Sequence, residues 1–151
     1  MLRAVPSAPR SPTERSRRLH PSGTGPRPTP GPLLLVTGVP EHRALLTRLA
    51  RRWRPLRLLV ADGGHAGLRM CAQRRVRLVV VDAQLPDVDA LEVVGALQGG
   101  DAPIVVIGHE TTPREHASFV WAGASAYVGR PLNLAEIDRT VRQLVVAQPP
   151  C

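Results

Sequence analysis

The sequence predicts an α/β protein built on one parallel sheet that is covered by helices on both faces. Five short apolar runs occur along the chain, and each is followed by a segment with helical spacing of its apolar residues. The third run, residues 78–81, is apolar at every position, which is typical of a central strand with both faces buried. Strict alternation of strands and helices favours right-handed crossovers and a doubly wound sheet.

The first two strand-helix units precede residue 74. Residues 33–36 predict a strand, and the spacing of Leu45, Leu46 and Leu49 predicts the helix that follows. Residues 56–60 predict a second strand that carries Arg57 in its middle. A charge within a strand suits the edge of a sheet. A short helix is then expected around residues 66–70.

The last three units follow the same plan. Strands are predicted at residues 78–82, 104–107 and 126–128, and helices at 91–97, 113–122 and 133–144. The fourth helix is expected to bury Ala117, Val120 and Trp121. Asn133, with Glu136 three residues later, predicts the start of the last helix.

Composition divides the chain into three parts. Residues 1–31 contain seven prolines and six arginines, and they are predicted to form a disordered basic arm. A transit peptide or a misplaced start codon are alternatives for this arm. Residues 32–147 predict one globular domain, and residues 148–151 a short tail.

The chain has a net charge of +8, and all 20 of its basic residues are arginine. Two groups, Arg51, Arg52 and Arg54, then Arg74, Arg75 and Arg77, are expected at the end of the sheet where the strands begin. With the arm they would form a surface for a polyanion such as nucleic acid. The alternative is that they complement helix dipoles and are otherwise solvated.

Cysteine content and hydropathy indicate the compartment. Cys71 and Cys151 have neither the spacing of a metal site nor the number for a disulfide framework. No apolar run approaches the length of about 18 residues that spans a bilayer. We therefore expect a soluble protein of the reducing cytoplasm, without a membrane partner.

Placing the second strand at an edge gives the flavodoxin-like strand order 2-1-3-4-5. That order brings the carboxyl ends of four strands together, which is where such folds bind ligands. The residues expected there are Thr37, Gly38, Asp82, Gly108 and Arg130. Asp82 is the central group, because a carboxylate at the end of a buried strand needs a donor or a cation.

Residues 81–90 and 122–131 resemble the receiver domain of bacterial response regulators, in the form of a single-domain, chemotaxis-regulator-like protein. The first segment matches the phosphoacceptor strand and loop, with Ala90 at a usual glycine position. The second matches the approach to the fifth strand. The resemblance implies that Asp82 is at the phosphoacceptor position and that Tyr127 is the aromatic switch residue.

The sequence departs from the family at three further places. Thr37 and Gly38 replace the acidic pair that holds Mg²⁺, Gly108 replaces a hydroxyl residue, and Arg130 replaces a lysine. Mg²⁺ is therefore a doubtful cofactor, with Asp82 as its remaining ligand. His109 and Glu110, which follow the fourth strand, are alternative ligands.

The family resemblance implies a non-enzymatic, stand-alone receiver in two-component phosphorelay signalling, with a sensor histidine kinase or a phosphotransfer protein as partner. Arg130 would either clamp the phosphoryl group or form an ion pair with Asp82. The alternative function is a phosphorylation-independent pseudo-receiver that docks another signalling protein or a polyanion.

Overall fold

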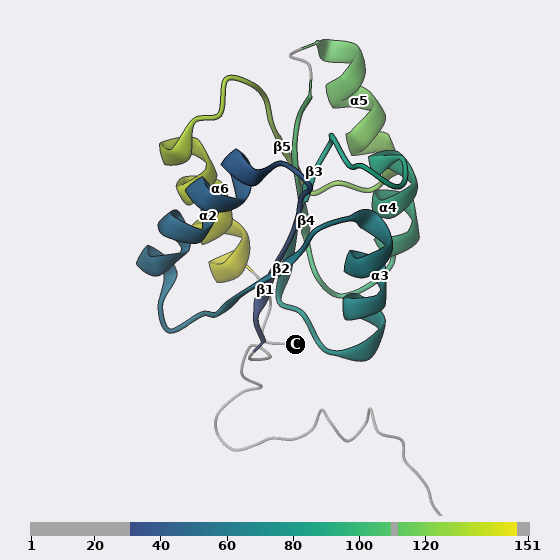
Figure 1. The fold of residues 1–151 in the computed structure, drawn as a ribbon. Helices are drawn as coiled ribbons and strands as arrows, with labels where there is room; N and C mark the ends of the chain where they lie inside the picture. The colour runs from purple at the N-terminus through teal and green to yellow at the C-terminus, as the bar shows by residue number, and fades with distance from the viewer. Residues whose placement is uncertain (1–30, 110–111, 148–151) are drawn as a thin grey trace, which may run out of the picture. The chain divides into compact units, whose positions relative to one another are not determined.

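Five parallel strands form the centre of the fold, in the order β2-β1-β3-β4-β5 (Figure 1). The computed structural model describes residues 31–109 and 112–147. The strands are β1 (Leu33–Val36), β2 (Leu58–Ala61), β3 (Leu78–Asp82), β4 (Ile104–Ile107) and β5 (Ala126–Val128). The predicted fold class and strand order are confirmed. The predicted arm and tail, except for Gly31, lie outside the described residues.

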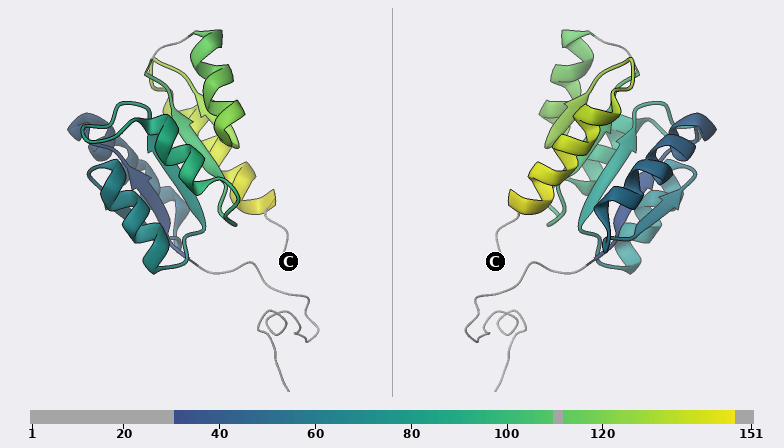
Figure 2. Two further views of the ribbon diagram at one scale, coloured as in Figure 1. Left: turned by 90° about the vertical axis from the view of Figure 1, so that its right-hand side faces the viewer. Right: turned by 90° about the vertical axis from the view of Figure 1, so that its left-hand side faces the viewer.

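Helices cover both faces of the sheet (Figures 1 and 2). One face carries α2 (Pro40–Leu49), the short 3-10 helix η1 (Ala50–Trp53) and α6 (Leu134–Ala147). The other carries α3 (Gly64–Gln73), α4 (Ala90–Leu97) and α5 (Pro113–Ala122). Within the described part of the chain, no helix is both long and apolar enough to cross a membrane.

The core has two layers because successive residues of a strand point to opposite faces. In β1, Leu33 and Leu35 pack on the α2 and α6 side, whereas Leu34 and Val36 pack on the side of α3, α4 and α5. Every residue of β3 is buried, as the uninterrupted apolar run predicts.

The predicted bounds of β2 were wrong by two residues. The strand begins at Leu58, so Arg57 lies before it rather than within it, and the Arg57 carbonyl accepts a hydrogen bond of 2.8 Å from the Leu33 N–H. β2 is nevertheless an edge strand that pairs with β1. Its edge position is therefore right, although the exposed charge marks the turn into the strand.

The prediction that α5 buries Ala117, Val120 and Trp121 was also wrong. Phe119 is the buried residue, whereas Val120 is 48% and Trp121 is 90% exposed. Residues two positions apart in a helix lie on nearly opposite sides, because each residue turns the helix by about 100°. Burial of Phe119 therefore turns Ala117 and Trp121 outward.

The start of α6 confirms the predicted cap. The Asn133 side-chain oxygen accepts a hydrogen bond of 3.1 Å from the Glu136 N–H. In the same helix, the Asp138 carboxylate accepts a bond of 2.8 Å from the Trp53 indole N–H. This bond fixes η1 against α6 across the domain.

Candidate functional site

Asp82 is the last residue of β3 and lies at the carboxyl end of the sheet. Its neighbours in the sheet are β1 on one side and β4 on the other. The residue has no exposed surface. A carboxylate at such a position requires compensation by donors within the protein.

Three donors from this chain supply that compensation. The Thr37 hydroxyl donates to Asp82 Oδ2 at 2.8 Å, and His42 Nδ1 lies 2.5 Å from the same oxygen. The Gln84 N–H donates to Oδ1 at 3.0 Å. Both carboxylate oxygens thus have protein partners. Thr37 also accepts a bond of 3.0 Å from the Val39 N–H, so its hydroxyl satisfies a backbone group just after β1.

His42 reaches Asp82 because of where α2 begins. The helix starts at Pro40, four residues after β1 ends, so His42 lies in its first turn. Side chains of a helix lean toward its N-terminus, which directs this one back over the end of β1. His42 is only 8% exposed. Its Nδ1 donates to the carboxylate, which leaves Nε2 as the distal nitrogen.

His42 was not among the residues that the sequence predicted for this site. A weaker signal was present: a polar residue in the first turn after a strand whose end lies beside the site. The contact joins residues 40 positions apart, so no local pattern could establish it.

Arg130 also lies at this end of the sheet, but its described hydrogen bonds go elsewhere. Nε donates to the Gly108 carbonyl at 3.0 Å, and a terminal nitrogen donates to the Gln84 side-chain oxygen at 3.3 Å. The structure therefore places His42, rather than Arg130, in hydrogen-bond contact with Asp82. An ion pair with Asp82 was one of two roles considered for Arg130, and the contacts described for Asp82 are instead with Thr37, His42 and Gln84.

Tyr127 occupies the space beside Gly108. Its ring stacks on His116 with centroids 4.9 Å apart, and its hydroxyl donates to the Glu115 carboxylate. A Cβ atom on Gly108 would lie 2.0 Å from the Tyr127 hydroxyl oxygen. The absence of a side chain at position 108 is thus what allows this position of the ring.

Pro86 fills the equivalent space at Gly38. A Cβ atom there would lie 2.7 Å from Pro86 Cδ, which is closer than real Cβ contacts. An acidic residue at position 38 would require the loop after β3 to move. At both Gly38 and Gly108, therefore, a neighbouring side chain packs where the family has a functional one.

The residues present do not fit Mg²⁺. This cation needs near-octahedral oxygen ligation, usually with carboxylates, yet Thr37 and Gly38 offer none and Asp82 is engaged by three donors. Among residues 31–109 and 112–147, no group of three or more His, Cys, Asp or Glu could hold a metal. Of the two substitute ligands considered, His109 is exposed and Glu110 lies outside the described residues.

A second carboxylate in the same loop joins it to α3. Asp87 accepts hydrogen bonds from the Gly64 and His65 N–H groups, at 2.8 and 3.1 Å, and lies 3.0 Å from His65 Nδ1. The bonds from Gly64 and His65 lower the pKa of Asp87 below its usual value. The loop that contains Pro86 is thereby held at the first turn of α3.

The doubly wound sheet, with an aspartate ending β3 and an aromatic residue on β5, agrees with what the resemblance to receiver domains implies. A family search agrees: residues 33–142 match the response regulator receiver domain. The chain belongs to this family. Members are, in general, non-enzymatic signalling modules of two-component systems.

A curated relative gives the same result. The transcriptional regulatory protein KdpE of Mycobacterium tuberculosis is 30% identical over 115 residues, which cover 75% of this chain and 50% of KdpE. The chain thus spans about half the length of that curated relative.

Two solved structures show the same fold at low identity. The chemotaxis response regulator CheY4 of Vibrio cholerae has a TM-score of 0.69 at 19% identity, covering 77% of this chain and 99% of CheY4. The receiver domain of Ssk1 from Saccharomyces cerevisiae, solved with the histidine phosphotransfer protein Ypd1, has a TM-score of 0.71 at 17% identity. That match covers 82% of this chain and 92% of the solved one.

Proposed function

We propose that this protein is a phosphorylation-independent receiver, a pseudo-receiver that signals by docking to another protein of a two-component system. The observation that carries the proposal is the satisfaction of Asp82. Its carboxylate is buried and receives bonds from Thr37, His42 and Gln84, so it is held as a structural group rather than exposed as a nucleophile.

Phosphoryl transfer to an aspartate depends on positioning and on neutralisation of the developing charge. A transferred group would have to displace His42 or Thr37 from Oδ2, or Gln84 from Oδ1. The residues that would neutralise its charge through a metal are replaced by Thr37 and Gly38. These features support the proposal that Asp82 does not accept a phosphoryl group.

Exposed apolar side chains on α5 support the proposed docking function. Trp121 is 90% exposed and Val120 is 48% exposed beside it, although large apolar side chains usually lie inside. Below this surface, Tyr127 is fixed by Glu115 and His116. The partner we propose is a histidine kinase, a phosphotransfer protein or a related signalling protein that binds this face without phosphate.

The test is intact mass after incubation with acetyl phosphate and Mg²⁺. We expect no added phosphoryl group on this protein, under conditions that modify a receiver domain with its acidic pair. That second domain shows that the reagent is active. The Asp82→Asn variant should behave as the parent protein does.

One phosphoryl group on the parent protein that is lost in Asp82→Asn would overturn the proposal. It would establish Asp82 as a phosphoacceptor despite its three internal partners. Modification that persists in Asp82→Asn would instead be on another residue, and the proposal would stand.

A further inference from the structure

The end of the sheet where the strands begin carries a concentration of positive charge. Two connections lead there, one from α2 through η1 to β2 and one from α3 to β3 (the lower end in Figure 1). Seven exposed arginines lie on these connections or in the last turn of α2, and together we call them the basic end: Arg48, Arg51, Arg52, Arg54, Arg57, Arg74 and Arg75. Neither residues 48–57 nor residues 74–77 contain an acidic residue.

Negative charges are distributed in the opposite way. Four exposed acidic residues follow strand ends or begin helices at the carboxyl end: Glu41, Asp62, Asp87 and Asp89. Near the basic end, Asp138 is already engaged by Trp53 and Arg142. Asp101 lies in the loop that leads into β4, where it is exposed and lines the same hollow as Arg74 and Arg75. The seven arginines still outnumber these two acidic residues, so the potential at this end is positive.

Helix capping does not account for so many arginines. A cation near a helix C-terminus stabilises by about 0.3–1 kcal/mol, and the effect is limited to the last turn. Arg48 in the last turn of α2, and Arg74 at the end of α3, can serve that purpose. Arg51, Arg52, Arg54 and Arg57 lie beyond the end of α2. Clustering them adds repulsion that a bound polyanion would remove.

The two arginine groups lie on both sides of the sheet. They lead into β2 and β3, which pair with opposite sides of β1. The first group follows α2 on one face of the sheet, and the second follows α3 on the other face. Positive charges spread over both sides of the sheet end can contact an extended polyanion at several phosphates.

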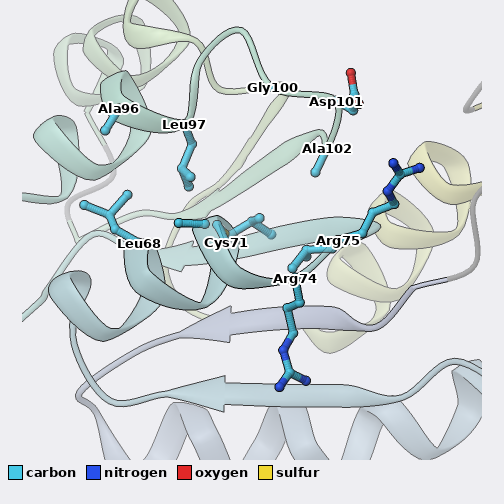
Figure 3. A pocket seen from close by; sticks show the side chains of 12 residues that line it. Leu68, Cys71, Arg74, Arg75, Ala96, Leu97, Gly100, Asp101 and Ala102 are labelled. Atoms are coloured by element: carbon cyan, nitrogen blue, oxygen red, sulfur yellow. The ribbon is translucent and has the colours of Figure 1, made fainter. Parts of the chain in front are cut away.

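The side chains at this end project outward from apolar residues that stay inside. Figure 3 shows Arg74 and Arg75 leaving the end of α3 in different directions, beside a hollow of about 380 Å³ lined by Leu68, Cys71 and Leu97. In the other group, Leu49, Ala50 and Trp53 are buried. Insertion into a bilayer needs several exposed apolar side chains. Residues 48–57 and 74–77 contain no fully exposed large apolar side chain, although Val146, which lines a pocket with Arg52 and Arg54, is 82% exposed. The chemistry favours phosphates of a nucleic acid over a lipid surface.

We propose that the basic end is a nucleic-acid-binding surface that contacts the phosphate backbone of a duplex without reading its sequence. This activity is separate from the docking function of α5, since the two surfaces share no residues. Backbone binding of this kind is sequence-independent and weakens with salt because condensed counterions are released.

The experiment uses the full chain and a labelled 20-base-pair DNA duplex, with anisotropy measured over a series of salt concentrations. If five of the seven guanidiniums each neutralise a phosphate, log K should fall with log salt at a slope of about −4.5. The variant Arg51→Gln/Arg52→Gln/Arg54→Gln should reduce the slope by about 2.7 and weaken binding by about tenfold or more.

The matched control removes the same charge elsewhere. Arg43→Gln/Arg114→Gln/Arg139→Gln changes three exposed arginines outside the basic end, and its salt slope should stay within about one unit of the parent value. Circular dichroism checks that both variants are folded. Residues 1–30 are present in every protein, so they cannot cause a difference between the variants.

Three results would overturn the proposal. The first is an equal loss of affinity in the two triple variants, which would indicate a response to net charge or to the rest of the chain. The second is no binding, or binding independent of salt. The third is tighter binding to vesicles of anionic lipid than to the duplex at equal salt, which would assign the surface to a membrane.

Discussion

Charge is arranged differently at the two ends of the sheet. At the carboxyl end, the Asp82 carboxylate is removed from water and matched by Thr37, His42 and Gln84 of the same chain. At the other end, seven arginines remain exposed without acidic residues in their own segments. A group satisfied internally stabilises the fold, whereas an exposed set of like charges acts on other molecules. Under the two proposals made above, recognition takes place at α5 and at the basic end rather than at Asp82.

The largest expected effect comes from breaking the buried pair. The His42→Ala variant leaves the Asp82 carboxylate without its nearest partner, and loss of one member of a buried pair costs about 3 kcal/mol or more. Urea unfolding measures the loss. Asp82→Asn/His42→Ala should recover more than half of it, because the neutral amide no longer needs a charged or strongly donating partner.

An exposed histidine–aspartate pair provides the control. His65 lies 3.0 Å from Asp87, but its side chain is 63% exposed, so water screens the interaction. His65→Ala should therefore cost a small fraction of what His42→Ala costs. If both variants lose the same free energy of unfolding, burial does not strengthen the Asp82 pair. The contrast between a buried charge at one end of the sheet and exposed charges at the other would then have no energetic basis.

The next effect tests whether the carboxyl end is closely filled. In Gly108→Ala the new methyl group would meet the Tyr127 hydroxyl at 2.0 Å, so the ring must leave its stack on His116. Overpacking of this kind costs about 1–3 kcal/mol. Thermal unfolding measures the cost, and the aromatic NMR signals of Tyr127 report the displacement.

Gly95→Ala is the matched substitution. Gly95 lies within α4, and a Cβ atom there would meet nothing within 4 Å. Alanine stabilises a helix interior by about 0.5–1 kcal/mol relative to glycine. The two glycine variants should therefore change stability in opposite directions. Stabilisation by Gly108→Ala would mean that Tyr127 does not depend on that space.

The smallest effect concerns acid stability. The pKa of Asp87 is lowered by hydrogen bonds from Gly64 and His65, so its ionised form favours the folded state. That contribution is present above the ordinary carboxyl pKa of about 4, and it is lost as pH falls through the lower folded value. Urea midpoints between about pH 6 and pH 3 should fall less steeply in Asp87→Asn than in the parent.

Asp138 makes a comparable contribution near the basic end. Burial raises its pKa, but hydrogen bonds from Trp53 and Arg142 outweigh burial and lower the pKa overall. Asp138→Asn should therefore also reduce the acid sensitivity. If neither variant changes the slope, these carboxylates do not link folding to pH.

The sequence predicted the fold because the pattern of apolar residues along each strand follows which of its positions are buried. Strand β3 is apolar at each position from Leu78 to Val81, and the structure buries all of them. The phase of α5 was harder to predict. Its sequence offers two apolar faces, one with Phe119 and one with Val120 and Trp121. Packing of Phe119 into the core on this side of the sheet, beside Tyr127, selects the first.

Part of the candidate site could also be predicted, because the strand order was predicted correctly. Strand order brings Thr37 and Asp82 together at one edge, and this juxtaposition follows from topology. The contact with His42 depends on the angle at which α2 leaves β1, which no spacing encodes. The position of Pro86 in the space beside Gly38 likewise depends on the path of the loop after β3.

Packing gives the two tryptophans of this chain very different exposure to solvent, which makes them distinguishable by fluorescence. Trp53 is 5% exposed and donates to Asp138, whereas Trp121 is 90% exposed on α5. A collisional quencher such as iodide should therefore reach only Trp121 in the native protein. Shielding of that emission on mixing with a partner would report occupancy of α5, while the emission of Trp53 would follow the integrity of the domain. The protein carries its own pair of independent fluorophores, one for contact and one for folding, without any label.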